Sequence, residues 1–241
     1  MTTSNSLIAL VASILLLSAP FLASSVQALE QVYAAFEKDG KPTMMYRPKS
    51  AARFNQKYNL TVGILPVKDR RVMNFYWYKD DLFEEPIPQG VTDILYNELR
   101  SSRLFKKVTR LKSPLPPKPD NASLQAYKEE HGIDMVISAD LVALNMLREK
   151  AGEMTRGFST GAVVAAPTRV MIDVSIFAQL IHLESGTLVW ADSVARRGQA
   201  FALMSVLAPE EVGSLTRQTL GFVFSDLKML LSAGGKIMVK Q

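Results

Sequence analysis

The sequence contains no cysteine and only two histidines among its 241 residues. Without a thiol, the chain has no disulfide framework, no thiol nucleophile, no thiolate ligand for a metal and no cysteine that could carry a lipid. The two histidines have no carboxylate beside them at metal-ligand spacing, so we expect no metal site. We expect His131 to end a helix and His182 to end a strand beside a turn. No glycine-rich phosphate loop follows a predicted strand, and no cofactor is expected.

The N-terminal segment has no charged side chain before Glu30. Its apolar run "LIALVASILLLSAPFLASS" is followed at 26–28 by "VQA", which has the small-residue spacing that signal peptidase accepts. We therefore predict that residues 1–28 are a secretory signal peptide, although "MTTSNS" supplies no basic residue. The alternative is a retained membrane anchor, but the run at 7–22 is shorter than the roughly 20 residues of a spanning helix and contains Pro20. The expected location is the periplasm, with association with the outer membrane left open.

The rest of the chain carries the whole formal charge of +5, since the leader has no ionisable side chain. Charged residues make up 21% of the sequence and hydrophobic residues 48%, which is typical of a globular protein and excludes a fibrous or disordered one. A positive surface could attract anionic lipid headgroups or an acidic partner. Nucleic acid is not expected, because the basic residues are scattered and not grouped in a stripe.

The apolar pattern predicts one mixed α/β domain over residues 58–235. Residues 29–57 have no sustained period and are predicted to form an extended N-terminal arm whose order depends on contacts with the rest of the chain. The nearly continuous apolar run from 60 to 67 is typical of a buried strand, and Pro66 indicates a sheet edge or a bulge there. After a long loop, the pattern predicts a helix with an apolar face formed by Val91, Ile94, Leu95, Leu99 and Phe105.

A second helix and a strand follow the proline-rich connector "SPLPPKPDNAS". Asn121 or Ser123 is placed to cap this helix, and Gly132 is placed to end it. "IDMVISADLVAL" then predicts a strand. The C-terminal helix, predicted within 212–235, ends at paired glycines. Its apolar face comprises Leu220, Val223, Phe224, Leu227 and Leu231.

The segment from 168 to 198 is predicted to be an antiparallel hairpin that closes the sheet. Ser185, Gly186 and Thr187 would form its turn, and Trp190 would pack on the sheet. One face of the first strand is expected to be fully buried, namely Ile172, Val174, Ile176, Ala178 and Leu180. We therefore predict an α/β fold of the α+β type, a mixed sheet with two to three helices mainly on one face.

One catalytic motif can be traced in the sequence. "GFSTG" satisfies G-x-S-x-G around Ser159, and Asp173 and His182 follow it in the order used by α/β-hydrolases. Geometry argues against a triad, because Asp173 and His182 lie nine positions apart on one predicted strand and point to opposite faces, about 30 Å from each other. The motif also lacks the strand and helix that should flank such a serine. We expect no catalytic residue and no enzymatic activity.

The long loop at 70–90 carries paired acids and four consecutive aromatic residues. The pairs Asp80-Asp81 and Glu84-Glu85 have the spacing of a solvated acidic loop and not that of a rigid acid–base pair. Four successive aromatic side chains cannot all face one core, so some are expected to be exposed as anchors for a partner. These are Phe75, Tyr76, Trp77 and Tyr78. The alternative is a loop folded back on the core.

A second candidate contact lies in "GFSTGAVVAAP", an apolar insertion of small residues between two predicted strands. If the insertion forms a short hairpin, Phe158, Val163 and Val164 would be available to a neighbouring subunit or a membrane. As a plain glycine-rich loop it would have no such role.

Three stretches carry a resemblance to a known group of domains: "LTVGILPVKD", "GIDMVISADL" and "VSIFAQLIHLESGTLVWADS". Together they resemble the α/β envelope-accessory domains of the curli-secretion channel protein, of the N-terminal part of the Tol-system periplasmic propeller protein and of the auxiliary lipoproteins of ABC-type lipid transporters. The resemblance covers roughly residues 58 to 232. Ala139 stands where a glycine is common, and the lipidated cysteine of many such proteins is missing.

The resemblance implies non-enzymatic work in the cell envelope, as a ring or as a cap on a larger machine. We therefore expect an exported accessory or assembly subunit of a bacterial envelope complex of the secretion, export or motor type. The expected partners are other subunits of that complex, with a homo-oligomer and anionic lipid left open. The alternative function is an auxiliary periplasmic lipid-binding component of an ABC-type transport system.

Overall fold

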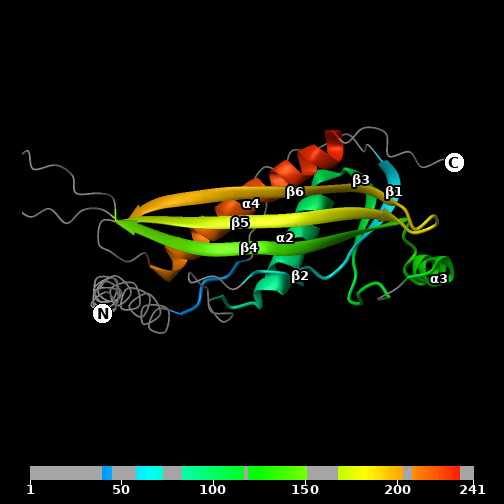
Figure 1. The fold of residues 1–241 in the computed structure, drawn as a ribbon, viewed down its shortest axis with the longest axis horizontal. Helices are drawn as coiled ribbons and strands as arrows, with labels where there is room; N and C mark the ends of the chain where they lie inside the picture. The colour runs from blue at the N-terminus through cyan, green and yellow to red at the C-terminus, as the bar shows by residue number, and fades with distance from the viewer. Residues whose placement is uncertain are drawn as a thin grey trace, which may run out of the picture.

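A six-stranded mixed sheet with helices packed on it forms the body of the computed structural model (Figure 1). The structure describes residues 40–44, 58–72, 83–116, 119–150, 168–202 and 208–233. Along the chain, the elements are β1 (Tyr58–Ile64), β2 (Lys68–Asp69), α2 (Ile87–Ser102), β3 (Phe105–Arg110), α3 (Asn121–His131), β4 (Met135–Lys150), β5 (Thr168–His182), β6 (Leu188–Ala202) and α4 (Pro209–Ala233). This arrangement confirms the predicted fold class.

The strands follow the order β3-β1-β4-β5-β6, and β2 pairs with β4 beyond the end of β1. β1 lies between β3 and β4 and runs parallel to both. β4, β5 and β6 are long antiparallel strands of 16, 15 and 15 residues. β3 and β6 are therefore the two ends of the strand order.

A bulge separates β1 from β2. Ile64 pairs with Ile137 and Lys68 pairs with Asp140, so three residues between the first pair and the second oppose two residues of β4. Pro66 lies in this irregular stretch, where its missing N–H costs no ladder hydrogen bond. Of the two predicted alternatives at this proline, a sheet edge or a bulge, the structure shows the bulge.

The hairpin of β5 and β6 forms as the sequence predicts. The main-chain N–H of His182 donates to the carbonyl of Thr187 over 2.9 Å, and Gly186 has a φ of +64°, a conformation that favours glycine. Trp190 pairs with Leu180 and packs against the main core. From 172 to 180, every second residue of β5 is at most 1% exposed, as the predicted alternation requires: Ile172, Val174, Ile176, Ala178 and Leu180.

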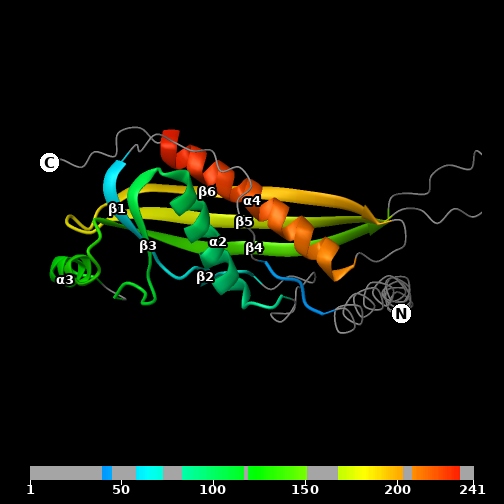
Figure 2. The same cartoon turned by 180° about the vertical axis from the view of Figure 1, so that it is seen from behind.

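Two helices, α2 and α4, cover the same face of the sheet (Figure 2). Their apolar sides and this face of the sheet bury one continuous core. The predicted apolar face of α4 is confirmed, with exposure of at most 2% for Leu220, Val223, Phe224, Leu227 and Leu231. Within the described part of the chain, no helix is long and apolar enough to cross a membrane.

The boundaries of α2 differ from the prediction. The helix already begins at Ile87, with Pro88 in its first turn, where a missing N–H costs nothing. It ends at Ser102, because Arg103 takes a left-handed conformation with a φ of +57°. Phe105 therefore belongs to β3 and not to the helix. It is still only 4% exposed, which is why it fits the apolar pattern.

α3 packs at the hairpin end of the sheet, apart from the layer of α2 and α4 (Figure 1). It ends at Gly132 with a φ of +60°, as predicted. A second, smaller core forms here from Leu65, Leu111, Leu124, Tyr127, Ile133, Val136 and Leu183. The helices thus lie mainly on one face, with α3 as a separate cover at one end.

The N-terminal cap of α3 is Asp120, which precedes both of the predicted candidates. The carboxylate of Asp120 accepts the main-chain N–H of Ser123 over 2.8 Å. Asn121 is already the first helical residue, and Ser123 contributes the donor that is capped. The prediction of Asn121 or Ser123 as the cap is therefore wrong, because a cap must precede the first helical residue with an extended backbone.

α4 crosses β6 in close contact at Gly198. A Cβ atom at this position would lie 2.0 Å from Oγ1 of Thr219 and 3.2 Å from a methyl group of Leu215. Thr219 is fully buried, and its hydroxyl donates to the carbonyl of Leu215 over 2.7 Å. The hydroxyl is therefore held in place, and only a glycine lets α4 lie this near to the strand.

Replacement of this glycine is expected to destabilise the fold. Gly198→Ala should lower the free energy of unfolding by about 1–3 kcal/mol, because the new methyl group overlaps Thr219. Urea denaturation followed by circular dichroism measures the effect. The control is Gln199→Ala, an exposed neighbour on the other side of the strand, which should change the same quantity by less than about 0.5 kcal/mol. Equal effects of the two substitutions would contradict the close contact.

Candidate functional site, a groove that holds the N-terminal arm

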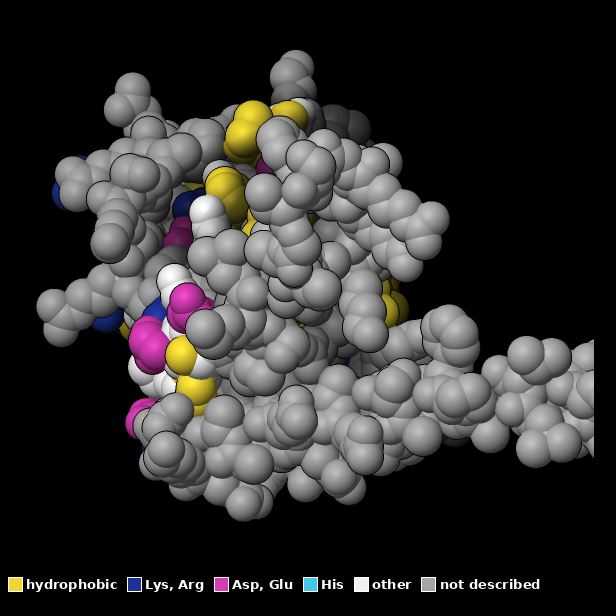
Figure 3. All heavy atoms as spheres, turned by 90° about the vertical axis from the view of Figure 1, so that its left-hand side faces the viewer, with side chains coloured by type: hydrophobic (Ala, Val, Ile, Leu, Met, Phe, Trp, Pro, Cys, Tyr) yellow, Lys and Arg dark blue, Asp and Glu magenta, His cyan; other side chains and the backbone are white. Residues whose placement is uncertain are grey.

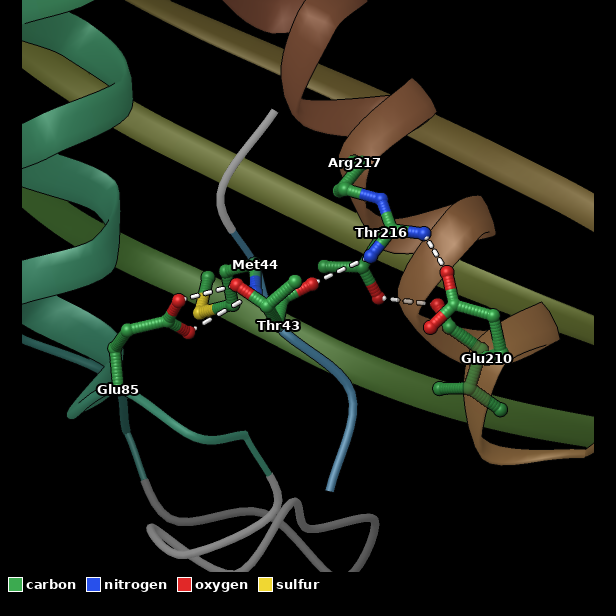
Figure 4. A network of polar contacts seen from close by, with 7 residues as sticks. Thr43, Met44, Glu85, Glu210, Thr216 and Arg217 are labelled. Atoms are coloured by element: carbon green, nitrogen blue, oxygen red, sulfur yellow. Dashed lines mark hydrogen bonds and ion pairs between the residues drawn. The ribbon is translucent and has the colours of Figure 1, made fainter. Parts of the chain in front are cut away.

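Residues 40–44, the described part of the predicted N-terminal arm, lie between α2 and α4 on the helix side of the sheet (Figure 4). We call these five residues the arm segment and the space between the two helices the arm groove. Pro42 and Met44 are buried, and Met44 belongs to the main core with 0% exposure. The remainder of 29–57 lies outside the described residues.

The α2 side of the groove binds the main chain of the arm segment. The carboxylate of Glu85 accepts the N–H of Met44 over 3.0 Å and also accepts the hydroxyl of Thr43. The main-chain N–H of Glu84 donates to the carbonyl of Pro42 over 3.2 Å. The prediction of a solvated acidic loop is therefore wrong for Glu85, whose partner lies 41 residues away in the sequence. The side chain of Glu84 is exposed, as expected.

The α4 side of the groove binds the same peptide unit. Nη1 of Arg217 donates to the carbonyl of Thr43 over 2.6 Å, and its Nη2 pairs with Glu210 on the same helix (Figure 4). This carbonyl and the N–H of Met44 belong to one peptide bond and point in opposite directions. Glu85, two residues before α2 begins, thus binds the N–H of this peptide unit, and Arg217 on α4 binds its carbonyl, each through a charge-assisted hydrogen bond.

A glycine on each helix makes room for the side chains of the arm segment. On α2, a Cβ atom at Gly90 would lie 3.2 Å from the sulfur of Met44. On α4, a Cβ atom at Gly213 would lie 2.6 Å from Cβ of Pro42. A glycine inside a helix costs about 1 kcal/mol relative to alanine, so an isolated one usually has a packing reason. These two glycines are the signal in the sequence that could have indicated the groove.

A buried ion pair joins α2 to α4 further along the two helices. Glu98 and Lys228 pair with side chains that are 5% and 3% exposed. Removing either partner would leave an uncompensated buried charge, which costs about 3–5 kcal/mol. The pair therefore keeps the two helices together and helps to set the width of the arm groove.

The residues of the traced hydrolase motif are not brought together. Asp173 and His182 stand nine positions apart on β5, which separates them by about 30 Å at about 3.3 Å per residue. Asp173 accepts two hydrogen bonds from Arg197 on β6, one of them 2.7 Å long. Nδ1 of His182 lies 2.9 Å from Oγ of Ser185 in the turn. Ser159 lies outside the described residues.

The two histidines lie where the sequence places them. His131 ends α3, and its ring packs edge-on against Tyr127 with the ring centres 4.4 Å apart. Nε2 of His131 is 3.8 Å from a carboxylate oxygen of Glu130. His182 ends β5 beside the turn. Among the described residues, no group of three or more histidines and carboxylates could hold a metal ion.

Both predicted contact segments lie outside the described residues, and both stay predictions. They contain Phe75, Tyr76, Trp77 and Tyr78 in one case and Phe158, Val163 and Val164 in the other. Lys150 and Thr168 flank the second segment and pair with each other at the end of the sheet farthest from α3 (Figure 1). α4 begins at this end of the molecule, with Glu210 and Glu211 in its first turn. Seen from this end, acidic side chains gather on one flank of the molecule (Figure 3).

Charged side chains tie the hairpin to the neighbouring helices. At the turn, the hydrogen bond from Lys128 of α3 holds the pKa of Glu184 below its usual value. On β6, the hydrogen bond to Asp226 of α4 raises the pKa of Arg196. Both pairs are open to solvent and add little stability by themselves. Their effect is to orient the turn and β6 relative to the helices.

Solved structures share this fold, although no protein-family model matches the sequence and no curated relative does either. A Helicobacter pylori protein described as a neuraminyllactose-binding hemagglutinin homolog is 12% identical, with a TM-score of 0.53, and the match covers 83% of this chain and 100% of that one. At this identity, the likeness shows the fold and nothing more.

Two further solved structures align with lower TM-scores. A Xanthomonas campestris protein of the DUF330 family is 13% identical with a TM-score of 0.47, over 81% of this chain and 95% of its own. The C-terminal domain of LpoB from Salmonella enterica is 13% identical with a TM-score of 0.30, over 56% of this chain and 81% of its own. The finer resemblance to curli, Tol and ABC-transport proteins stays a prediction.

Removal of the Glu85 carboxylate is expected to free the arm segment. In Glu85→Ala, the N–H of Met44 loses a charged acceptor, an interaction of about 1.5–3 kcal/mol. Hydrogen–deuterium exchange should therefore be about tenfold faster or more in the peptide that covers 40–44. Arg217→Ala should act in the same direction. The matched control is Glu84→Ala, because Glu84 binds the arm through its main-chain N–H. Unchanged exchange in the first two variants would refute the groove.

Proposed function

We propose that this chain is a non-enzymatic accessory or assembly subunit of a bacterial cell-envelope complex, of the secretion, export or motor type, and that it acts through contacts with other proteins. The observation that carries the proposal is the arm groove. There, Glu85 and Arg217 bind the two polar groups of one peptide unit of an extended segment. A site that binds polypeptide through its main chain suits a subunit that joins proteins.

The pairing of three carboxylates within the fold supports a non-enzymatic role. Asp173 on β5 pairs with Arg197 on β6, and Asp226 on α4 pairs with Arg196 on β6. Glu98 on α2 pairs with Lys228 on α4. Each carboxylate thus connects two elements of the fold. A general acid or base must instead be directed at a substrate and free to exchange its proton. These three carboxylates are engaged in holding the domain together.

The leader and the fold support a role in the envelope. The signal peptide predicted at 1–28 would carry the chain across the inner membrane. The fold shared with the Helicobacter pylori protein, whose description names a binding activity, favours binding over catalysis. Residues 75–78 are the proposed anchors for a partner, and the apolar residues at 158, 163 and 164 are the proposed contact with a subunit or membrane.

The alternative is an auxiliary periplasmic lipid-binding component of an ABC-type transport system. The formal charge of +5 favours anionic headgroups. Native mass spectrometry of the protein purified from its envelope distinguishes the two functions. Bound lipid would support the alternative, whereas a lipid-free spectrum with co-purifying envelope subunits would support the accessory role.

Complementation of a deletion strain tests the proposal. Ser159→Ala, Asp173→Asn and His182→Ala are each expected to restore the phenotype as well as the natural chain does, because these residues perform no chemistry. Arg217→Ala is expected to restore it less well at the same protein level, since it frees the arm segment. Immunoblots of the periplasmic fraction supply the protein levels. Loss of function in any of the first three variants at an unchanged level would overturn the non-enzymatic assignment.

A further inference from the structure

The outer edge of β6 is open in the described part of the chain. β6 is the last strand in the order, and its strand partner there is β5. It is 15 residues long, and on the side away from the helices it presents the exposed small residues Ala191, Ser193 and Ala195. A long open edge offers main-chain donors and acceptors to another strand, and the N–H of Ser193 donates here to the carboxylate of Asp192 over 2.7 Å.

α4 adds an apolar stripe beside this edge. Thr219 and Asp226 both contact β6. Phe222 lies three residues after Thr219, and Met229 lies three residues after Asp226. The four side chains therefore lie along one stripe of the helix. Phe222 and Met229 are 55% and 59% exposed. Two large apolar side chains therefore stand next to the open strand.

We propose that a second copy of this chain binds at the edge, with the two β6 strands pairing antiparallel around a two-fold axis at Val194. This pairing joins the two sheets into one and brings the α4 stripes of both copies together above it. Each stripe then covers its own counterpart, as in an isologous interface. The inference rests on the proposed function in taking the chain to act through protein contacts, but it uses residues outside the arm groove.

The charges on β6 select this register. Residues opposite each other in an antiparallel pair lie on the same side of the sheet, so the axis must pass through a residue to keep both helix layers on one side. An axis at Val194 places Asp192 of each copy opposite Arg196 of the other, which gives opposite-charge pairs at both ends. Moving the axis by one residue removes these pairs. An axis at Asp192 would set the two copies of Asp192 opposite each other, and an axis at Arg196 would set the two copies of Arg196 opposite each other.

The surroundings of Arg196 allow a second carboxylate to bind. Its side chain is 54% exposed while it pairs with Asp226, which is 27% exposed. A guanidinium has several N–H donors in a planar fork, so it can bind two carboxylates at once. On the other side of the sheet, the same register brings Ser193 opposite Ala195, two small residues without charge. The strand is thus complementary to itself on both faces.

Disulfide cross-linking tests the register, because the chain has no cysteine of its own. The mature protein carrying Ser193→Cys is mixed with a tagged copy carrying Ala195→Cys and is then oxidised. The two thiols face each other in the mixed dimer, so a linked dimer of one copy of each is expected. Each variant alone sets its thiols diagonally, about 7–8 Å apart between Cα atoms, which exceeds the usual span of a disulfide. Both positions are exposed, and circular dichroism verifies the fold.

Charge reversal tests the energy of the interface. Asp192→Lys and Arg196→Glu should each raise the Kd of the dimer about tenfold or more in sedimentation equilibrium, because each places like charges opposite each other twice. A mixture of the two variants should regain nearly the natural affinity, since their charges are again opposite. A surface patch without this register would not show such a rescue.

Two further variants separate the α4 stripe from general surface hydrophobicity. Phe222→Ser should weaken the dimer, whereas Val72→Ser should leave its Kd unchanged, because Val72 is 73% exposed but follows β2 on the other side of β4 and β5. A natural chain that stays monomeric up to about 1 mM would overturn the inference. A dimer that is insensitive to Asp192→Lys, or that gives no mixed cross-link, would overturn it as well. Neither result bears on the complementation by Arg217→Ala, so the proposed function is judged separately.

Discussion

The position of α4 depends on its close contact with β6 at Gly198, where the missing side chain lets Thr219 lie against the strand. The buried pair of Glu98 and Lys228 then joins α4 to α2. Because the helix is held on two sides, both of its flanks are set. One flank closes the arm groove, and the other stands beside the open edge of β6. Any change at this contact would therefore alter both surfaces together.

The arm groove shows how α4 and the residues that lead into α2 can hold an extended segment, which pairs with no strand in the described part of the chain. A buried peptide unit needs partners for its N–H and its carbonyl, and a helix surface has no free main-chain groups to supply them. Here the side chains of Glu85 and Arg217 supply both. Each of these charges in turn gains a partner that replaces part of its lost hydration. Arm segment and groove therefore stabilise each other, and residues 40–44 are part of the folded domain.

The polar residues of this domain mainly connect its own strands, helices and turns. Carboxylates connect strand to strand, helix to strand and helix to helix, and the hydroxyls and histidine of the hairpin shape its turn. The arm groove is filled by the chain's own residues 40–44, and the edge of β6 is the described strand edge that still offers main-chain groups. Main-chain hydrogen bonds can be made by any sequence, so neighbouring side chains must add the selectivity at such sites. This division suits a subunit whose work is to join proteins.

The sequence by itself determined the elements with a regular apolar pattern. Alternate burial predicts β5, helical spacing predicts α4, and Gly186 marks the turn, because each of these signals is local. β3 escaped prediction, since Phe105 is its one fully buried residue and the strand lies at the edge of the sheet. Tertiary structure alone decided the role of Glu85, whose partner Met44 is 41 residues away, and the stripe beside β6. Pairing between distant segments depends on how the elements pack, and no local period records it.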